Sequence, residues 1–363
     1  MREDGRDVFL LYINIMPYPK PLLKWVGGKT QIINQLVQCF PSTIENYYEP
    51  FLGGGSVLIA FMSLVHDGKI HVNGHIFASD VNERLIHLYK NVQSRPLELL
   101  NCVEDIQALY DKCPATATNP ATAAANPNRK PHTLAEAQTS QEAMFYWIRQ
   151  QYNELPLDML GSPNAAAMLM FLNKTCFRGL YREGPYGFNV AFGNYKDPQI
   201  ADRQHILHLS VLIQRVKFSC CSFDTALTSV ASGDFVYMDP PYAPENDKSF
   251  VKYNKHGFDL NTHKQLFTMC HAMGRKNIDF IMCNAEVELV RNAFKTDPYE
   301  YTPISCKRTI NSKKPDSVAN EVIIRSGSGI QKAHLNSIKT SLNEFEIALQ
   351  EMGPINTGGG TAD

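Results

Sequence analysis

The chain alternates between short apolar runs and longer segments in which apolar residues recur at helical spacing. The runs have the length of buried strands and lie at 47–51, 76–78, 216–223, 234–238, 280–284 and 321–325. The helical patterns cover 31–40, 57–62, 81–92, 197–213, 260–273 and 287–294. Strands that alternate with helices predict an α/β fold with an open sheet, in which ligands bind at the carboxyl ends of the strands.

The pattern changes between residues 95 and 210. Helical patterns at 144–152 and 165–173 follow a stretch, 113–140, that is rich in Ala, Thr, Asn and Pro and is typical of a flexible insertion. Turn residues Gly184, Pro185 and Gly187 predict a hairpin. We therefore expect one domain from 21–94 and 211–326, and an inserted, mostly helical domain with a β-hairpin over 95–210.

The two ends of the chain have patterns of their own. Residues 1–20 are an extension to which the sequence assigns no function. Residues 327–363 are expected to form a linker, an amphipathic helix and a frayed tail. The apolar residues of that helix recur at spacings of three and four, as Leu335, Ile338, Leu342, Phe345 and Leu349. We expect the helix to dock on the protein's own body, so that the protein is a monomer, with a dimer contact as the alternative.

Composition excludes several classes of protein. The 363 residues carry a net charge of −1, so any contact with nucleic acid must come from local basic patches. The nine cysteines include no C-x-x-C pair, which argues against a zinc site and favours reduced thiols in an intracellular protein. The apolar run 57–65 is too short to span a bilayer, and 2–16 lacks the features of a secretion signal.

The strand pattern at 234–238 ends at Asp239-Pro240-Pro241-Tyr242. Neither proline can donate to a sheet ladder, so the strand stops there and a carboxylate and two carbonyls are held rigid. Such acceptors suit an amine that donates two hydrogen bonds, for example the exocyclic amine of a nucleobase, with Tyr242 placed to stack on the ring. The alternative is an ordinary turn with Tyr242 in the core.

A second candidate site is the glycine turn Gly53-Gly54-Gly55-Ser56, which joins a strand pattern to a helix pattern. Its glycines would allow a close approach to a ligand. Asp80 ends the next strand pattern and is our candidate for binding ribose hydroxyls, although it would also serve as a helix N-cap. Leu58 stands where a dinucleotide fingerprint needs its third glycine, and Leu23 where a P-loop needs its first, so both of those interpretations are weaker.

Basic and aromatic residues alternate over 174–196, and a second basic stretch lies at 307–314. A hairpin of this kind can enter a DNA groove while its cations hold phosphates and its aromatic rings stack or wedge. The alternative is an ordinary hairpin with a solvated charged face.

Five motifs in order carry a resemblance to a known family. They are Lys-Trp-Val-Gly-Gly-Lys at 24–29, Glu-Pro-Phe-Leu-Gly-Gly-Gly-Ser at 49–56, Ser-Asp-Val-Asn at 79–82, Phe-Asn-Val-Ala-Phe-Gly at 188–193, and the Asp239 motif. The chain resembles the Dam-type, alpha-group DNA adenine methyltransferases, which use S-adenosylmethionine, over roughly residues 20–326. The resemblance implies a Rossmann-like cofactor-binding catalytic domain (21–94 and 211–326), a DNA target-recognition domain (95–210), and double-stranded DNA as the partner, without a metal.

The resemblance also implies roles for individual residues. The catalytic candidates are Asp239, Pro240 and Tyr242; the cofactor-binding candidates are Trp25, Lys29, Glu49, Phe51, Gly53, Gly55, Asp80 and Asp239. The DNA-binding candidates are Lys24, Phe177, Arg178, Arg182, Asn194, Tyr195, Lys307, Arg308, Lys313 and Lys314. Ala191 and Asn194 replace the proline and arginine of the family pattern, so a GATC target is one hypothesis among others, as is a role in restriction–modification.

Three other functions stay open. An RNA base or a protein side-chain amide could be the methyl acceptor, although amide methylation usually has Asn where Asp239 stands. A non-catalytic DNA-binding relative is the alternative from another class, and the intact Asp239, Tyr242 and Asp80 argue against it. A dehydrogenase is disfavoured by the missing third glycine.

Overall fold

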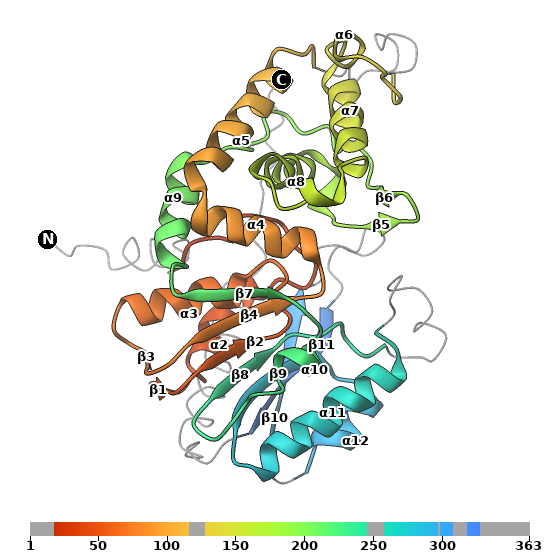
Figure 1. Ribbon diagram of the computed structural model, residues 1–363. Coiled ribbons are helices and arrows are strands. Elements are labelled where there is room, and N and C mark those ends of the chain that lie inside the picture. The colour runs from red at the N-terminus through yellow and green to blue at the C-terminus, as the bar shows by residue number, and fades with distance from the viewer. Residues whose placement is uncertain (1–17, 116–127, 245–257, 297, 308–317, 327–363) are drawn as a thin grey trace, which may run out of the picture. The chain divides into compact units, whose positions relative to one another are not determined.

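The computed structural model describes residues 18–115, 128–244, 258–296, 298–307 and 318–326, and Figure 1 shows their arrangement. The chain up to Ser326 forms one compact unit, and Gly327–Asp363 is a separate unit. The N-terminal extension up to residue 17 and the expected C-terminal helix lie outside the described residues.

The described residues form a seven-stranded sheet in the order β10-β11-β9-β8-β2-β4-β7. The strands are β2 (Tyr47–Glu49), β4 (Ile76–Asp80), β7 (Val216–Cys220), β8 (Phe235–Met238), β9 (Asp279–Ala285), β10 (Glu300–Lys307) and β11 (Val318–Ser326). β9, β8, β2, β4 and β7 are parallel, and β11 and β10 are antiparallel additions at one edge. The expected open α/β sheet is confirmed. The sequence did not predict β10, an edge strand that can accommodate Pro303.

Successive residues of the central strands face two separate cores. In β8, Phe235 and Tyr237 belong to one apolar cluster, whereas Val236 and Met238 belong to the other. Because side chains alternate along a strand, a run that is apolar throughout must be covered on both faces. The helices α10 (Phe223–Ala226), α11 (Leu260–Arg275) and α12 (Glu288–Phe294) supply the second cluster.

The first cluster is continuous with the helical part of the protein. At its sheet end it includes apolar residues of α2 (Ile33–Val37), α3 (Ser56–His66) and α4 (Glu83–Ser94). The short turn η1 (Lys29–Gln31) precedes α2 and adds no residue to the cluster. The cluster continues into α5 (Pro96–Asp111), α7 (Gln141–Asn153), α8 (Pro163–Thr175) and α9 (Arg203–Leu212). α4 contacts β4, β7, α5, α8 and α9, and Figure 1 shows it between the sheet and the other helices. The inserted helices therefore share a core with the sheet part.

Short elements complete the fold. β1 (Thr43–Ile44) and β3 (His71–Val72) pair in parallel. The predicted hairpin is present as β5 (Glu183–Gly184) and β6 (Gly187–Phe188), with antiparallel pairing. η2 (Leu157–Met159) and η3 (Phe177–Gly179) are single turns.

The stretch 113–140 is more ordered at its ends than its composition predicts. Cys113 is buried, and α6 (Leu134–Ala137) begins with Thr133 as its N-cap. Arg129 donates to the buried Glu142 of α7 at 2.8 Å. Polar contacts therefore hold residues 128–140 in place although the stretch has few apolar residues, and residues 116–127 lie outside the described part of the chain.

Candidate active site

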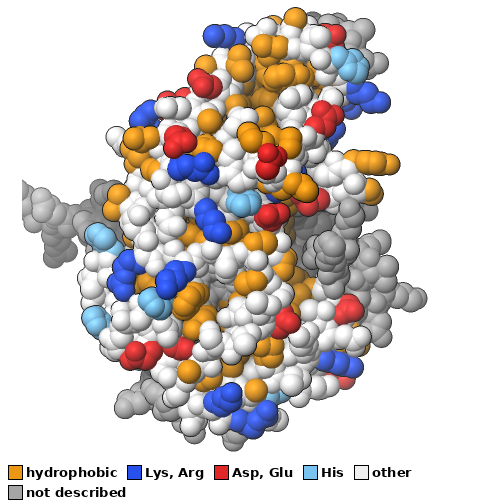
Figure 2. Space-filling model, in the orientation of Figure 1, with side chains coloured by type: hydrophobic (Ala, Val, Ile, Leu, Met, Phe, Trp, Pro, Cys, Tyr) orange, Lys and Arg blue, Asp and Glu red, His pale blue; other side chains and the backbone are white. Residues whose placement is uncertain are grey.

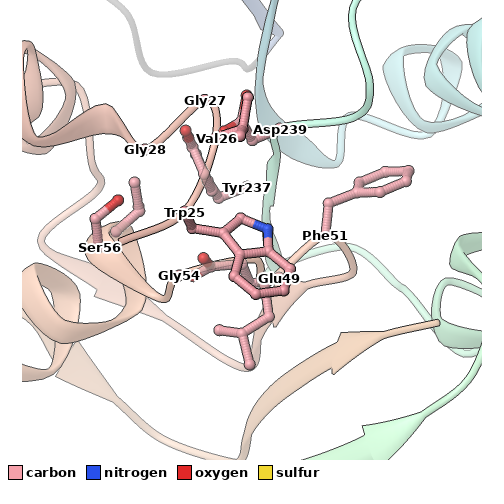
Figure 3. Close-up of a pocket in the computed structure, with 12 residues that line it drawn as sticks. Trp25, Val26, Gly27, Gly28, Glu49, Phe51, Gly54, Ser56, Tyr237 and Asp239 are labelled. Carbon is pink, nitrogen blue, oxygen red and sulfur yellow. The ribbon is translucent and has the colours of Figure 1, made fainter. Parts of the chain in front are cut away.

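Three carboxylates stand at the carboxyl ends of three neighbouring parallel strands. Glu49 ends β2, Asp80 ends β4, and Asp239 follows β8, with β2 lying between the other two strands. A pocket opens at this edge, where the sheet geometry predicts a ligand. It is lined by Trp25, Val26, Gly27, Gly28, Glu49, Phe51, Leu52, Gly54, Ser56, Val57, Tyr237 and Asp239. Figure 3 shows the Trp25 indole in the middle of the pocket, with Phe51 and Asp239 on separate sides of it.

The glycine turn between β2 and α3 makes room for side chains of the protein itself. Gly55 is the N-cap of α3 with φ 69°, and a Cβ there would lie 2.4 Å from the Tyr89 hydroxyl oxygen. A Cβ on Gly54 would lie 2.8 Å from the Cβ of Trp25. These glycines let Tyr89 and Trp25 pack against the turn. That they also let the backbone approach a ligand stays a prediction.

Glu49 is a buried acid in the wall of the pocket. It is 2% exposed, and its Oε2 accepts a 2.7 Å hydrogen bond from the Tyr47 hydroxyl. Burial raises the pKa of Glu49 to about 8, against the lowering effect of the Tyr47 hydrogen bond. Without a cation nearby, the protonated form of this carboxyl is therefore favoured at neutral pH.

Asp80 joins the glycine turn to the start of α4. Its Oδ2 accepts from the Gly53 amide and its Oδ1 from the Asn82 amide, each at 2.9 Å. Burial raises its pKa, and these backbone donors oppose that rise. The helix N-cap is Asn82, which accepts from the Leu85 amide, so the alternative role of Asp80 as the N-cap was wrong. The Val81 amide also acts on this carboxylate, so three backbone donors face about four acceptor sites and room is left for one hydroxyl.

Asp239 forms a buried ion pair with Lys29. The Lys29 Nζ lies 2.6 Å from Asp239 Oδ2 and donates also to the Gly27 carbonyl at 2.5 Å. Desolvation would lower the pKa of Lys29, but the Asp239 carboxylate outweighs it and the pKa is raised. The other oxygen, Oδ1, is buried and has no hydrogen-bond partner among the described residues. An unsatisfied buried acceptor beside a pocket is a position where a ligand donor would be bound.

The anion site that the sequence predicts at Gly27 and Gly28 depends on a helix that begins there. The expected helix over 31–40 is present only as η1 and the five-residue α2, so Gly27 and Gly28 do not begin a long helix whose dipole would hold an anion. The ammonium group of Lys29 instead serves a carboxylate of the protein.

Several hydrogen bonds fix the segment that follows Asp239. The Pro241 carbonyl lies 3.2 Å from His263 Nε2 on α11, and the Ala243 amide donates to Asn284 Oδ1 on β9 at 2.9 Å. Asn284 is fully buried. Neither His263 nor Asn284 was predicted from the sequence as a site residue. A polar residue at the carboxyl end of the apolar strand beside β8 is a signal that could have found Asn284.

The structure brings together the DNA-binding candidates of residues 24 and 174–196. The Phe177 amide donates to the Ala191 carbonyl and the Gly193 amide to the Thr175 carbonyl, each at 2.8 Å, so two loops run side by side. Lys24 Nζ lies 5.3 Å from the centre of the Tyr195 ring. Arg178 and Asn194 have positive φ values of 60° and 51°, a conformation that is uncommon outside glycine and is found at functional sites.

Arg182 is oriented by the hairpin. Its Nε donates to Asn189 Oδ1 at 2.7 Å, and its Nη2 lies 3.3 Å from the Asn189 carbonyl oxygen. The guanidinium group is therefore fixed along one edge, while the residue as a whole is exposed. At the hairpin turn Tyr186 is 92% exposed, and Figure 2 shows apolar side chains protruding where Figure 1 labels β5 and β6.

The second basic stretch lies mostly outside the described residues. Lys307 ends β10, and its backbone pairs with Val318. Arg308, Lys313 and Lys314 lie outside the described residues. On the visible face in Figure 2, acidic and basic side chains are interspersed.

The described residues contain no group of three or more His, Cys, Asp or Glu side chains arranged to hold a metal. None of the described helices combines the length and the apolar character required to cross a bilayer.

Comparisons with known proteins agree with this geometry. The profile of the D12 class N6 adenine-specific DNA methyltransferases matches residues 25–310. The type II methyltransferase M.MjaIII of Methanocaldococcus jannaschii is 30% identical over 302 residues, which cover 81% of this chain and 93% of that protein. The retron Ec67 DNA adenine methylase of Escherichia coli is 28% identical over 84% of this chain and 91% of its own length. The chain therefore belongs to the D12 class N6 adenine-specific DNA methyltransferase family, whose methyl donor is S-adenosylmethionine.

Proposed function

We propose that Asp239 and Pro240, which follow β8, bind the exocyclic amino group of an adenine that has left a DNA duplex and present its nitrogen to the methyl donor. The buried, unpartnered Oδ1 of Asp239 is the observation that supports this proposal. One amine hydrogen is donated to Asp239 Oδ1 and the other to the Pro240 carbonyl. Adenine's amino lone pair is delocalised into the ring, so holding both hydrogens draws the nitrogen toward tetrahedral geometry and aims its lone pair.

The residues that line the pocket suit S-adenosylmethionine, which supplies an electrophilic methyl group on a sulfonium centre when bound. The cofactor is cationic at its sulfonium and amino groups, and the buried Glu49 carboxyl in the wall can become its anionic partner. Trp25 and Phe51 give the pocket aromatic walls, and the remaining acceptor capacity of Asp80 suits a ribose hydroxyl. Gly53 and Gly55 have positive φ values and allow the turn between β2 and α3 at this side of the pocket.

Lys29 acts through Asp239 in this arrangement. Its ammonium holds Oδ2 at 2.6 Å, which favours the ionised carboxylate against the effect of burial on the pKa of Asp239 and leaves Oδ1 for the substrate. Tyr242 stacks on the extruded base and offsets part of the flipping cost, a few kcal/mol.

The DNA side of the proposal assigns two roles. Arg182, fixed by Asn189, reads a base edge. The other DNA contacts come from Lys24, which lies beside the Tyr195 ring, and from two loops that pair with each other and carry Phe177, Arg178 and Asn194. Lys307, Arg308, Lys313 and Lys314 hold phosphates.

Sequencing of modified adenines after expression in a methylation-deficient host tests the activity and gives the target. Asp239→Asn should then abolish single-turnover methyl transfer on that target while cofactor binding persists. Methylated cytosine as the product, or full activity of Asp239→Asn, would contradict the proposal.

The roles in DNA recognition are tested with duplexes that each carry one altered base pair, at two salt concentrations. Arg182→Ala should lose about 1–3 kcal/mol of discrimination at one position. Lys313→Ala with Lys314→Ala should weaken all duplexes alike and lower the salt slope by about one per contact. If the lysine pair changes the preferred base and Arg182→Ala does not, the two assignments are reversed.

A further inference from the structure

Tyr242 is held by a residue far from it in the sequence. Its hydroxyl donates a 2.8 Å hydrogen bond to Glu321 Oε2, and Glu321 lies on β11. The Lys29 ammonium lies 5.0 Å from the centre of the Tyr242 ring. The ring is therefore fixed at its hydroxyl end and covered on one face by a cation, so with Lys29 in this position a base can stack only on the other face.

Glu321 is an unfavourable neighbour for the catalytic carboxylate. Its charge acts in the same direction as burial in raising the pKa of Asp239, against Lys29. A second carboxylate near Asp239 therefore works against the ionised form that the proposed chemistry needs. The hydrogen bond to Tyr242 is a contact at this position that a neutral, apolar residue could not make.

The position of Glu321 in the sheet makes it a rigid support. Its backbone is in register with Ala285 of β9 on one side and Ile304 of β10 on the other. A carboxylate whose backbone is held between two strands is a more rigid acceptor than one on a loop. The charge-assisted hydrogen bond that it accepts therefore orients the donor more tightly.

We propose that Glu321 is a positioning residue that sets the ring plane of Tyr242, so that an extruded adenine stacks with its amino group at Asp239 Oδ1. The inference rests on the proposed function, because it assigns the stacking surface to Tyr242. Glu321 itself touches no reacting atom.

The test compares Glu321→Ala, Glu321→Gln and Tyr242→Phe with the wild type. Single-turnover methylation is measured on a duplex that the wild-type enzyme has been shown to methylate, and base extrusion by the fluorescence of 2-aminopurine at the target adenine. Misplacement of a reacting group by about 1 Å can cost on the order of a hundredfold in rate, so Glu321→Ala and Tyr242→Phe should lose about tenfold to a hundredfold. The dissociation constant of the cofactor should change less than about twofold, since neither side chain lines its pocket.

Glu321→Gln distinguishes the hydrogen bond from the charge. Its amide oxygen can still accept from Tyr242, so it should recover most of the rate, whereas a purely electrostatic role would leave it as slow as Glu321→Ala. The double variant Tyr242→Phe with Glu321→Ala should be no slower than Tyr242→Phe alone. Glu286→Ala is the matched control, because it removes a carboxylate from the residue after β9 that pairs with Arg291 instead.

Additive losses in the double variant, or a Glu321→Gln variant as slow as Glu321→Ala, would overturn the inference. So would an equal loss in the Glu286→Ala control. If Glu321→Ala does not fold, Tyr242→Phe and Glu321→Gln keep the size of the side chains and test the same bond. A wild-type enzyme that methylates no DNA would instead refute the proposed function.

Discussion

Replacing Asp239 should lower the stability of the protein as well as its activity. From the sequence, Asp239→Ala removes only a catalytic acceptor and leaves the fold intact. In the structure, Lys29 is 4% exposed and its ammonium depends on Asp239 Oδ2 at 2.6 Å. Without Asp239 a buried cation remains with the Gly27 carbonyl as its partner. Removal of one member of a buried ion pair costs about 3–5 kcal/mol.

This cost should be visible in thermal unfolding without cofactor. For a protein of this size, about 1 kcal/mol shifts the melting temperature by roughly 2 °C, so Asp239→Ala should melt about 6–10 °C below the wild type. Adding Lys29→Met to Asp239→Ala removes the unpaired ammonium and should recover most of that loss. Neither variant should transfer methyl groups, so stability and activity separate in the double variant.

The reasoning is refuted if Asp239→Ala melts at the wild-type temperature, or if Lys29→Met gives no recovery in its background. Either result would mean that the Lys29 ammonium is hydrated or loses its proton at little cost in free energy. The buried ion pair with Asp239 would then contribute little to stability. The matched exposed pair, Arg203 with Glu104, is a control: Glu104→Ala should change the melting temperature little, because exposed pairs contribute about 0–1 kcal/mol.

Other predictions follow from the buried Glu49 and from the stretch around residue 120. The pKa of Glu49 is raised to about 8 in the folded protein from 4.5, so its protonated form stabilises the fold at low pH. This contribution is lost as pH rises through about 8, and the melting temperature of the cofactor-free wild type should fall relative to Glu49→Gln between roughly pH 5 and 9; parallel curves would contradict this. If the cationic cofactor ionises Glu49, its binding near pH 7 should release a proton, seen as a dependence of the calorimetric binding enthalpy on buffer; Glu49→Gln should show none. Deletion of 116–127 should leave folded yield and cofactor affinity unchanged, whereas deletion of 115–133 also removes the Arg129 contact to buried Glu142 and should lower the melting temperature; equal melting temperatures would show that this ion pair is dispensable.

The sequence predicted the site best where local chemistry and sheet geometry agree. Glu49, Asp80 and Asp239 each end an apolar run, and the carboxyl ends of neighbouring parallel strands must meet at one edge. Apolar periodicity also found the central strands and most helices, because both faces of the sheet are covered. It missed β10, where polar residues and Pro303 interrupt the apolar pattern of an edge strand.

The contacts that were not predicted from the sequence join residues that are distant along the chain. Lys29 and Asp239 are 210 positions apart, and Tyr242 and Glu321 are 79 apart. A lysine after two glycines suggests an anionic ligand, and a glutamate in a strand suggests a solvated face. Neither local pattern specifies which side chain of the protein will contact the lysine or the glutamate. The two contacts form only when the folded chain brings the end of β8 close to η1 and to β11.

The link between the two proposed binding sites runs through adjacent residues of one segment. Asn173 of α8 fixes the Lys24 backbone from both sides, with its Oδ1 accepting from the Lys24 amide and its Nδ2 donating to the Lys24 carbonyl, each at 2.9 Å. The next residue, Trp25, lines the pocket and stacks on Tyr181 with ring centres 5.0 Å apart. Tyr181 immediately precedes Arg182, the proposed base reader. If bound DNA changes the affinity of the protein for the cofactor, the bound cofactor must change the affinity for DNA by the same factor. We infer that such coupling passes through the stack of Trp25 on Tyr181, because it joins residues of the two proposed sites directly.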